Sequence, residues 1–151
     1  MKKTRIAQLE CIVFRKNGDT HEFLLLKRIP EKGEFWQPVS GGFEAEDSSR
    51  LEGAYRELLE ETSISKVSVV RVIEDVHRFE FNRHHLTDEP TDPITEYVYG
   101  FEVAPDTEVS ISNNIYPEHT EFRWVSFAEA IGLLKWDNNK DALKKLNELL
   151  S

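Results

Sequence analysis

One segment of the sequence carries both a start signal for a helix and a helical repeat of apolar residues. Ser49 is followed three residues later by Glu52, the spacing of a capping box in which each side chain bonds a backbone N–H of the first turn. The apolar residues that share one face of such a helix are Leu51, Ala54, Tyr55, Leu58 and Leu59. We therefore expect a helix from about residue 49 to residue 62, packed on a core by that face.

The segments around this helix have the composition of β-strands. Apolar, partly β-branched runs cover residues 6–14, 23–27, 67–76, 79–81, 96–103 and 121–125. Asn17-Gly18 favours a hairpin turn between the first two runs, and the polar residues 82–93 indicate a loop. Ser126 caps a second predicted helix, and a leucine-rich stripe near the C-terminus indicates a third. Strands, helix, strands and helices predict an α/β sandwich with a mixed sheet.

Length and charge limit the classes of function. The 151 residues fit one compact domain, residues 1–151. A formal net charge of −9 disfavours nonspecific binding to nucleic acid, which needs a basic surface. The same charge allows a small phosphorylated substrate, because divalent cations can lie between protein carboxylates and substrate phosphates.

Hydropathy and cysteine content point to a cytoplasmic protein. No apolar run approaches the roughly 18 residues that span a bilayer, so we expect no membrane partner. The basic first residues run into alternating polar and apolar positions, which does not fit a secretory signal. The single cysteine, Cys11, lies in a strand-like run where a small buried residue is expected. A monomer and a homodimer both remain open.

Three carboxylates share one face of the predicted helix. Glu57, Glu60 and Glu61 stand at i, i+3 and i+4, so they project within a sector of roughly 100°. Hard cations such as Mg²⁺ accept carboxylate oxygens and offset the repulsion between like charges at this spacing. A solvated helix face is the alternative for such a run, but Arg56 can pair with Glu60 and a Gly-Gly pair precedes the helix. The strip is a candidate metal site.

The helix and the Gly-Gly pair before it resemble the Nudix box, which reads G-x5-E-x7-R-E-U-x-E-E-x-G-U with U apolar. The matching residues are Gly42 and then Arg56-Glu57-Leu58-Leu59-Glu60-Glu61-Thr62-Ser63-Ile64. The resemblance implies an α/β/α sandwich and metal-dependent hydrolysis of nucleoside diphosphates linked to another group. It also implies metal ligands at Glu57, Glu60 and Glu61, catalytic roles for Glu57 and Arg56, and Mg²⁺ as cofactor, with Mn²⁺ possible.

Two positions depart from the box. Ser48 stands where the box has its first Glu, and Asp47 or Glu46 could take that role if one residue is inserted. Ser63 replaces the box Gly, whose tolerance of positive φ suits the end of a helix. We expect these changes to affect rate and metal affinity more than fold.

Shorter motifs outside the box resemble the bacterial dihydroneopterin triphosphate pyrophosphatase branch of the family. They are Phe35-Trp36-Gln37-Pro38-Val39-Ser40-Gly41, Thr95-Glu96, Glu118-His119 and Phe122-Arg123-Trp124-Val125. This resemblance implies that Glu118 lies on a loop over the metals as a ligand or general base. On sequence alone, Glu118 is an acidic loop residue for which a solvated position is the alternative.

Four further residues are candidates for substrate binding. Arg28 follows a strand and can reach a phosphate, although a surface salt bridge is equally compatible with its position. Trp36 could stack on a base or a pterin ring or belong to the core. Gly41 and Gly42 lie between this aromatic segment and the acidic helix, at the expected edge of the substrate.

The sequence thus predicts hydrolysis of a phosphoanhydride bond in a nucleoside-triphosphate-like molecule. We expect dihydroneopterin triphosphate, or a purine nucleoside triphosphate such as dATP, to give a monophosphate and pyrophosphate. A Nudix-fold binding or regulatory module is an alternative that the altered box favours. A second alternative is hydrolysis of dinucleoside polyphosphates, and a third is a purely structural role for the acidic helix.

Overall fold

The computed structural model describes residues 7–81 and 93–151 of the chain. The strands are β1 (Ala7–Asn17), β2 (Thr20–Arg28), β3 (Trp36–Gln37), β4 (Val39–Gly42), β5 (Val69–Phe81), β6 (Ile94–Val103) and β7 (His119–Val125). The helices are α1 (Arg50–Thr62), α2 (Phe127–Leu133) and α3 (Asp137–Leu150), with single 3₁₀ turns η1 (Pro30–Lys32) and η2 (Lys66–Ser68). The expected loop at residues 82–93 lies, apart from Pro93, outside the described residues. None of the described helices is long and apolar enough to cross a membrane.

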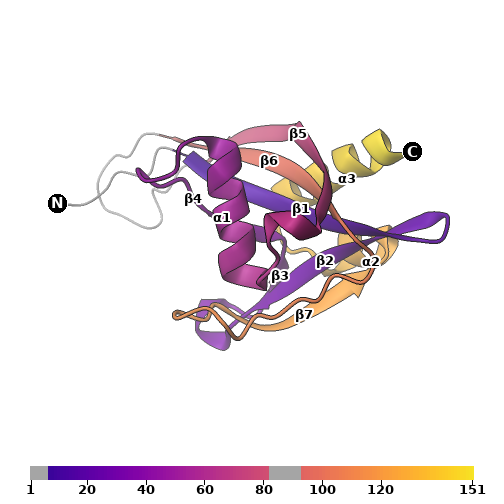
Figure 1. The fold of residues 1–151 in the computed structure, drawn as a ribbon, viewed down its shortest axis with the longest axis horizontal. Helices are drawn as coiled ribbons and strands as arrows, with labels where there is room; N and C mark the ends of the chain where they lie inside the picture. Colours follow the sequence, from indigo (N-terminus) through magenta and orange to yellow (C-terminus); the bar gives the residue numbers. More distant parts are fainter. Residues whose placement is uncertain (1–6, 82–92) are drawn as a thin grey trace.

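The sheet is mixed, as predicted. Its main order is β3-β2-β1-β6-β5, and β4 and β7 are joined to it through β1 and β2. β1 and β6 run parallel, whereas the other strand pairs are antiparallel. α1 covers one face of the sheet, and α2 and α3 lie on the other, which gives three layers (Figure 1). The prediction of an α/β/α sandwich is confirmed.

The first hairpin opens away from its turn. β1 and β2 pair only where residues 14–17 face residues 20–23, next to the turn at Gly18, whose φ is 62°. Beyond this point β1 pairs with β4, and β2 pairs with β3 and β7. The two strands therefore diverge, and the short strands β3 and β4 lie in the opening between them. The candidate site forms at this opening.

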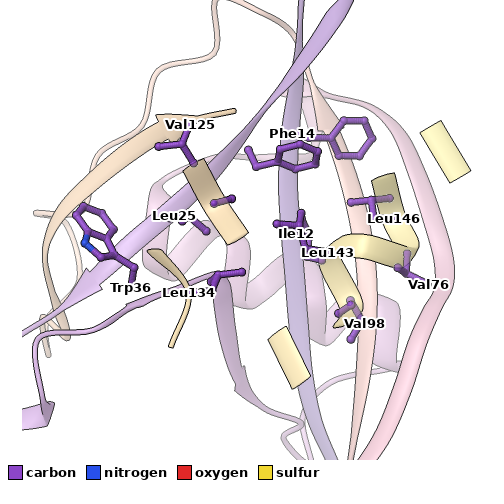
Figure 2. Close-up of a cluster of buried hydrophobic side chains, with 13 residues drawn as sticks. Ile12, Phe14, Leu25, Trp36, Val76, Val98, Val125, Leu134, Leu143 and Leu146 are labelled. Carbon is purple, nitrogen blue, oxygen red and sulfur yellow. The ribbon is translucent and has the colours of Figure 1, made fainter. Parts of the chain in front are cut away.

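Two apolar clusters hold the layers together, one on each face of the sheet. Alternation along β1 sends Leu9, Cys11 and Val13 toward α1 and sends Ile12 and Phe14 toward α2 and α3. Figure 2 shows the second cluster, in which leucines of α3 meet the sheet. Cys11 is fully buried, as expected for a small apolar residue.

α1 begins and ends as the sequence predicts. Ser49 is the N-cap, and its hydroxyl accepts a hydrogen bond from the backbone N–H of Glu52 at 3.1 Å. Ser63 ends the helix with φ 63° and ψ 14°, the left-handed conformation for which the family box has Gly. A non-glycine residue tolerates this conformation at a modest cost, so the helix ends at the same place without the glycine.

The apolar runs at residues 67–76 and 79–81 belong to one long strand and not to two shorter ones. β5 runs from Val69 to Phe81, with an irregularity in its pairing to β6 between Ile73 and His77. Asp75 has a φ of 54° there, which bends the strand without ending it. A break in apolar alternation thus marks a bulge in this strand.

Two carboxyl groups are buried between the sheet and α3. Glu10 on β1 and Glu96 on β6 are 0% and 7% exposed, and Asn139 of α3 donates a hydrogen bond to Glu10. Burial is the main cause that raises the pKa of both carboxyls, and the charge of Glu96 raises that of Glu10 further. At least part of this pair is therefore protonated in the folded state near neutral pH.

Candidate functional site

A cavity of about 530 Å³ lies at the opening between β1 and β2, under the C-terminal half of α1. Its walls come from the ends of β1 and β2, from β3 and β4, from α1, and from the segment before β7. The predicted site residues that line it are Arg28, Gly41, Gly42, Glu57, Glu60, Glu61 and Glu118. Residues more than 100 positions apart in the sequence thus meet in a single polar cavity.

Glu57 lies against the backbone of β4. Gly41 pairs with Leu9 and so faces α1, and a Cβ atom built on Gly41 would overlap the carboxylate of Glu57. Burial raises the pKa of Glu57 to about 7, against the opposing effect of its hydrogen bond to Arg56. Because Gly41 has no side chain, it leaves room for the carboxylate of Glu57 beside β4.

Arg56 connects the helix to the loop before it. Its guanidinium donates to Asp47 at 2.8 and 2.9 Å, to the carbonyl of Gly42 at 2.9 Å and to Glu57 at 2.8 Å. A longer contact of 3.4 Å reaches Glu60, at the i+4 spacing expected from sequence. The hydrogen bond from Arg56 is the main cause that lowers the pKa of Asp47.

Asp47 is a loop carboxylate that hydrogen-bonds Arg56, although it stands one position before the box Glu. Its side chain is 5% exposed, whereas Ser48 is exposed. The loop before a helix can take up one extra residue without shifting the helix, since only the N-cap is fixed. Of Asp47 and Ser48, Asp47 is therefore the one whose side chain contacts the Arg of the box.

Glu61 and Glu60 have different surroundings. The Glu61 side chain is 7% exposed and accepts hydrogen bonds from Asn114 at 3.1 Å and from the ring of His119 at 3.0 Å. The Glu60 side chain is 49% exposed and faces the open part of the cavity. The sequence did not predict the partners of Glu61, because they lie 53 and 58 residues away on the chain.

Two residues predicted to act on the substrate contact each other. Arg28, at the end of β2, donates to the carboxylate of Glu118 at 2.9 Å, and both side chains line the cavity. The backbone N–H of Ile29 also donates to the carbonyl of Glu118, which fixes the segment before β7 to the end of β2. Glu118 therefore lines the cavity, but its negative charge is paired with the guanidinium of Arg28.

The structure contradicts the prediction that Trp36 stacks on the substrate ring. Trp36 is 9% exposed and packs in the core with Leu25, Val125 and Leu134 (Figure 2). The neighbouring Phe35 lines the cavity in its place. Adjacent residues of an extended segment point to opposite sides, so an error of one residue exchanges the core aromatic and the cavity aromatic.

Residues 7–146 match the NUDIX domain family. The chain belongs to this family. The predicted Nudix fold and the assignment to the Nudix hydrolases are therefore confirmed. A protein of Listeria monocytogenes assigned to the NUDIX hydrolases, known as a crystal structure, is 32% identical, with a TM-score of 0.80 over 95% of this chain and 93% of that one.

Three curated relatives differ in their activities. An octanoyltransferase from Myxococcus xanthus is 29% identical over 88% of this chain but only 34% of its own length, so the chain spans about a third of that relative. An RNA pyrophosphohydrolase from Pelagibacter ubique is 28% identical over 89% of this chain and 88% of that protein. A dihydroneopterin triphosphate diphosphatase from Haemophilus influenzae is 28% identical over 84% and 79%. The three relatives thus share sequence with this Nudix chain, and their names give them different activities.

The donor set of the cavity fits the divalent metal that Nudix hydrolases generally use. Within residues 7–81 and 93–151, no three His, Cys, Asp or Glu side chains lie together as a ready-made metal cluster. The cavity nevertheless carries an excess of carboxylates, the hard oxygen ligands that Mg²⁺ and Mn²⁺ prefer. Its lining has five carboxylates and two cations, namely Glu44, Glu57, Glu60, Glu61 and Glu118 against Arg28 and Lys32.

Proposed function

We propose that this Nudix protein is a Mg²⁺-dependent pyrophosphohydrolase that converts a nucleoside-triphosphate-like substrate to a monophosphate and pyrophosphate. The observation that carries the proposal is the shared cavity, into which the acidic face of α1 and the cationic side chains of Arg28 and Lys32 both open. Carboxylates and cations on facing walls suit a ligand whose phosphates are bound partly by the protein and partly through metal. A solvated structural helix would not need this second wall.

The metal would be held by Glu57, Glu60 and Glu61. When bound, it would neutralise phosphate charge and lower the pKa of a water molecule, the two contributions that phosphoanhydride hydrolysis requires. The bond that forms joins the water oxygen to phosphorus, and the bond that breaks is a bridging P–O bond whose electron pair leaves with the departing phosphate group. Mn²⁺ offers the same hard, oxygen-preferring chemistry and is an alternative ion.

The residues of the chain bind and orient the substrate. Arg28 would bind a phosphate from the end of β2, where Glu118 already orients its guanidinium. Arg56 has its donors engaged by Asp47, Gly42 and Glu57, so its role is to position Glu57. The backbone of Gly41 and Gly42 forms the cavity wall beside these groups.

Phe35 is our candidate for contact with the ring of the substrate. It lines the cavity and is only partly buried, and it packs edge-on against Trp136 at 5.7 Å between ring centroids. Phe35→Ala should raise KM more than it lowers kcat, because stacking is felt in the ground and transition states alike. Glu118→Gln should lower kcat more than it raises KM if this carboxylate accepts a proton. Steady-state kinetics on the two variants would separate these roles, and equal effects on KM would contradict them.

The activity test is a screen of purified protein with Mg²⁺. Dihydroneopterin triphosphate, dATP and other nucleoside triphosphates, dinucleoside polyphosphates and 5′-triphosphate RNA should be compared, with pyrophosphate and orthophosphate measured separately. We expect pyrophosphate from dihydroneopterin triphosphate or from a purine nucleoside triphosphate. Release of orthophosphate, or preference for dinucleoside polyphosphates or RNA, would replace the substrate assignment. Absence of hydrolysis for every compound, together with retained binding, would identify a binding module.

The role of the acidic face is tested by charge removal. Glu60→Gln and Glu61→Gln should each lower kcat by at least about 100-fold, a loss of about 2.7 kcal/mol of transition-state stabilisation. Glu52→Gln is the matched control, since Glu52 lies on the same helix and pairs with Lys66 on the surface at 2.6 Å, away from the cavity. Full activity of either cavity variant, or activity in excess chelator, would remove the mechanism.

A further inference from the structure

A line of three polar side chains runs from β3 through β7 to the acidic face of α1. The Nε2 atom of Gln37 lies 3.0 Å from Nε2 of His119, and Nδ1 of His119 lies 3.0 Å from Oε2 of Glu61. The side chains of His119 and Glu61 are 2% and 7% exposed. Water therefore has little access to the contact between them, and the hydrogen bonds of the line depend on one another.

The amide group of Gln37 determines which ring nitrogen of His119 carries the proton. The Nε2 group of Gln37 is an amide NH₂, which can only donate, so the Nε2 atom of His119 must accept. A neutral imidazole that accepts at Nε2 carries its proton at Nδ1. The Nδ1–H group of His119 then donates to Oε2 of Glu61.

The state of His119 decides what Glu61 can offer to a cation. A ring protonated at Nε2 would turn the lone pair of Nδ1 toward the carboxylate, which is repulsive. The Nδ1–H tautomer is the one that donates to Glu61 and so holds its carboxylate in place.

The second oxygen of Glu61 is fixed in the same way. Asn114 donates to Oε1 at 3.1 Å, so each oxygen of the carboxylate accepts one N–H. A carboxylate has about four lone-pair directions, so about two remain for other partners. Glu61 also lines the cavity, where such a partner can reach it.

We propose that His119 is a positioning residue that holds Glu61 as an oriented anion for the divalent cation, and that Gln37 sets the tautomer in which it does so. The proposal rests on the proposed function in one respect, because Glu61 is taken there as a metal ligand. It does not depend on which compound is hydrolysed. Hydrogen-bond partners of metal ligands contribute about 10- to 100-fold to metal affinity or activity in other proteins.

The tautomer can be measured directly on the unmodified protein. A long-range ¹H–¹⁵N correlation spectrum of uniformly ¹⁵N-labelled protein distinguishes a protonated ring nitrogen from an unprotonated one. We expect His119 to carry its proton on Nδ1, whereas free neutral histidine favours Nε2. The signals of His119 are assigned by their absence in His119→Asn. A proton on Nε2 in place of Nδ1 would overturn the proposal.

Variants test the consequence for metal binding without any substrate. His119→Phe removes both ring nitrogens, so the dissociation constant for Mn²⁺, followed by electron paramagnetic resonance with Mg²⁺ competition, should rise by about 10- to 100-fold. His119→Asn is the conservative variant, because its amide branches close to the position of Nδ1 and can still donate to Glu61. It should bind Mn²⁺ within about threefold of the unmodified protein, a difference below 1 kcal/mol.

Gln37 provides a second, independent pair of variants. Gln37→Met removes the donor that sets the tautomer, so the Nδ1 proton should be less fully populated and Mn²⁺ affinity should fall, but by less than in His119→Phe. Gln37→Glu presents only acceptors, which draws a proton to Nε2 and should weaken Mn²⁺ binding even though the variant adds a negative charge. Simple attraction by the added charge predicts the opposite direction. Tighter binding by Gln37→Glu would therefore contradict the proposal.

The outcomes separate this proposal from the proposed function. Equal Mn²⁺ affinity of His119→Phe and the unmodified protein would overturn the role of His119, whatever is hydrolysed. Equal weakening by His119→Phe and His119→Asn would also overturn it, because the donor to Glu61 would then be irrelevant. If His119→Phe fails to fold, the tautomer measurement and the Gln37 variants still test the positioning role of His119. Normal metal binding with no hydrolysis of any triphosphate would leave the positioning role intact and refute the proposed activity.

Discussion

Replacement of Asp47 by Ala removes the anchor of Arg56 in the loop before α1. The carboxylate accepts two hydrogen bonds from Arg56 at 2.8 and 2.9 Å and one from the backbone N–H of Glu44 at 2.9 Å. Hydrogen bonds to a charged group contribute about 1.5–3 kcal/mol each, but Arg56 keeps its bonds to Gly42 and Glu57 after the change. Removal of one partner from a buried ion pair costs about 3–5 kcal/mol.

We therefore expect Asp47→Ala to lower the free energy of unfolding by about 3 kcal/mol, the low end of that range, because the Arg56 side chain is 21% exposed. For a domain of this size, this corresponds to a decrease in Tm of about 6–12 °C. Urea unfolding followed by tryptophan fluorescence measures the difference, provided that the slope with denaturant is unchanged. Turnover should also fall, since Arg56 holds Glu57 at 2.8 Å.

Ser48→Ala is the matched control in the same loop. Ser48 is exposed, so its replacement should change the free energy of unfolding by no more than about 0.5 kcal/mol. Asp47→Asn retains one acceptor oxygen without the charge. Its free energy of unfolding should lie between those of Asp47→Ala and Ser48→Ala. If Asp47→Ala and Ser48→Ala are equally stable and equally active, Asp47 does not replace the box Glu and the reasoning is refuted.

The pH dependence of the difference provides a second check. The hydrogen bond from Arg56 lowers the pKa of Asp47 in the folded state below its unfolded value. Such a group stabilises the protein at pH values above the unfolded pKa of about 3.9, and this stabilisation is lost as the pH falls through the folded pKa. The deficit of Asp47→Ala should thus be complete at pH 7 and become smaller below about pH 4. A deficit that is constant from pH 7 to pH 3 would show that the charge of Asp47 contributes nothing.

Two further variants test the packing around the cavity and the buried carboxyl pair. Gly41→Ala should displace the carboxylate of Glu57 and lower kcat by about 100-fold with little loss of Tm, whereas Gly132→Ala in α2, whose added methyl group would meet no other part of the protein, should leave kcat unchanged. Glu96→Gln should raise the free energy of unfolding by at least about 1 kcal/mol at pH 8, because burial raises the pKa of Glu96 and the folded state loses stability as the pH rises above about 4.5. Urea unfolding at pH 4 and pH 8 checks this, and an equal gain at both values would mean that ionisation beside Glu10 is not the cause.

The parts of the fold that depend on local sequence could be predicted from the residues alone. The capping box at Ser49, the apolar face of α1 and the turn at Gly18 involve residues within a few positions of each other. Their chemistry is therefore visible in a short window of sequence. The acidic face of α1 belongs to the same class, because helical spacing alone brings Glu57 and Glu61 to one side.

The parts that could not be predicted depend on contacts between distant residues, or on which of two adjacent residues faces the core. The bond of Glu61 to His119 crosses 58 residues, and no local pattern marks it. Trp36 begins the two-residue strand β3 and Phe35 directly precedes it, and so short a strand gives too little alternation to establish which of the two faces the core. The sequence does not single out Asp47 from its neighbours, because the loop before a helix has no periodicity to count.

The arrangement around α1 explains how three like charges at i, i+3 and i+4 are compatible with a stable helix. Each carboxylate has a partner outside its own strip: Arg56 for Glu57 and Glu60, and the pair Asn114 and His119 for Glu61. The repulsion within the strip is thus balanced by the protein itself, at a site where each pair would otherwise cost a few tenths of a kcal/mol. Loss of a single carboxylate charge then weakens the hydrogen bonds that this carboxylate accepts and removes one source of repulsion. Neutral glutamine variants of this strip should consequently remain folded, so that their kinetics report on the chemistry of the cavity and not on the stability of the helix.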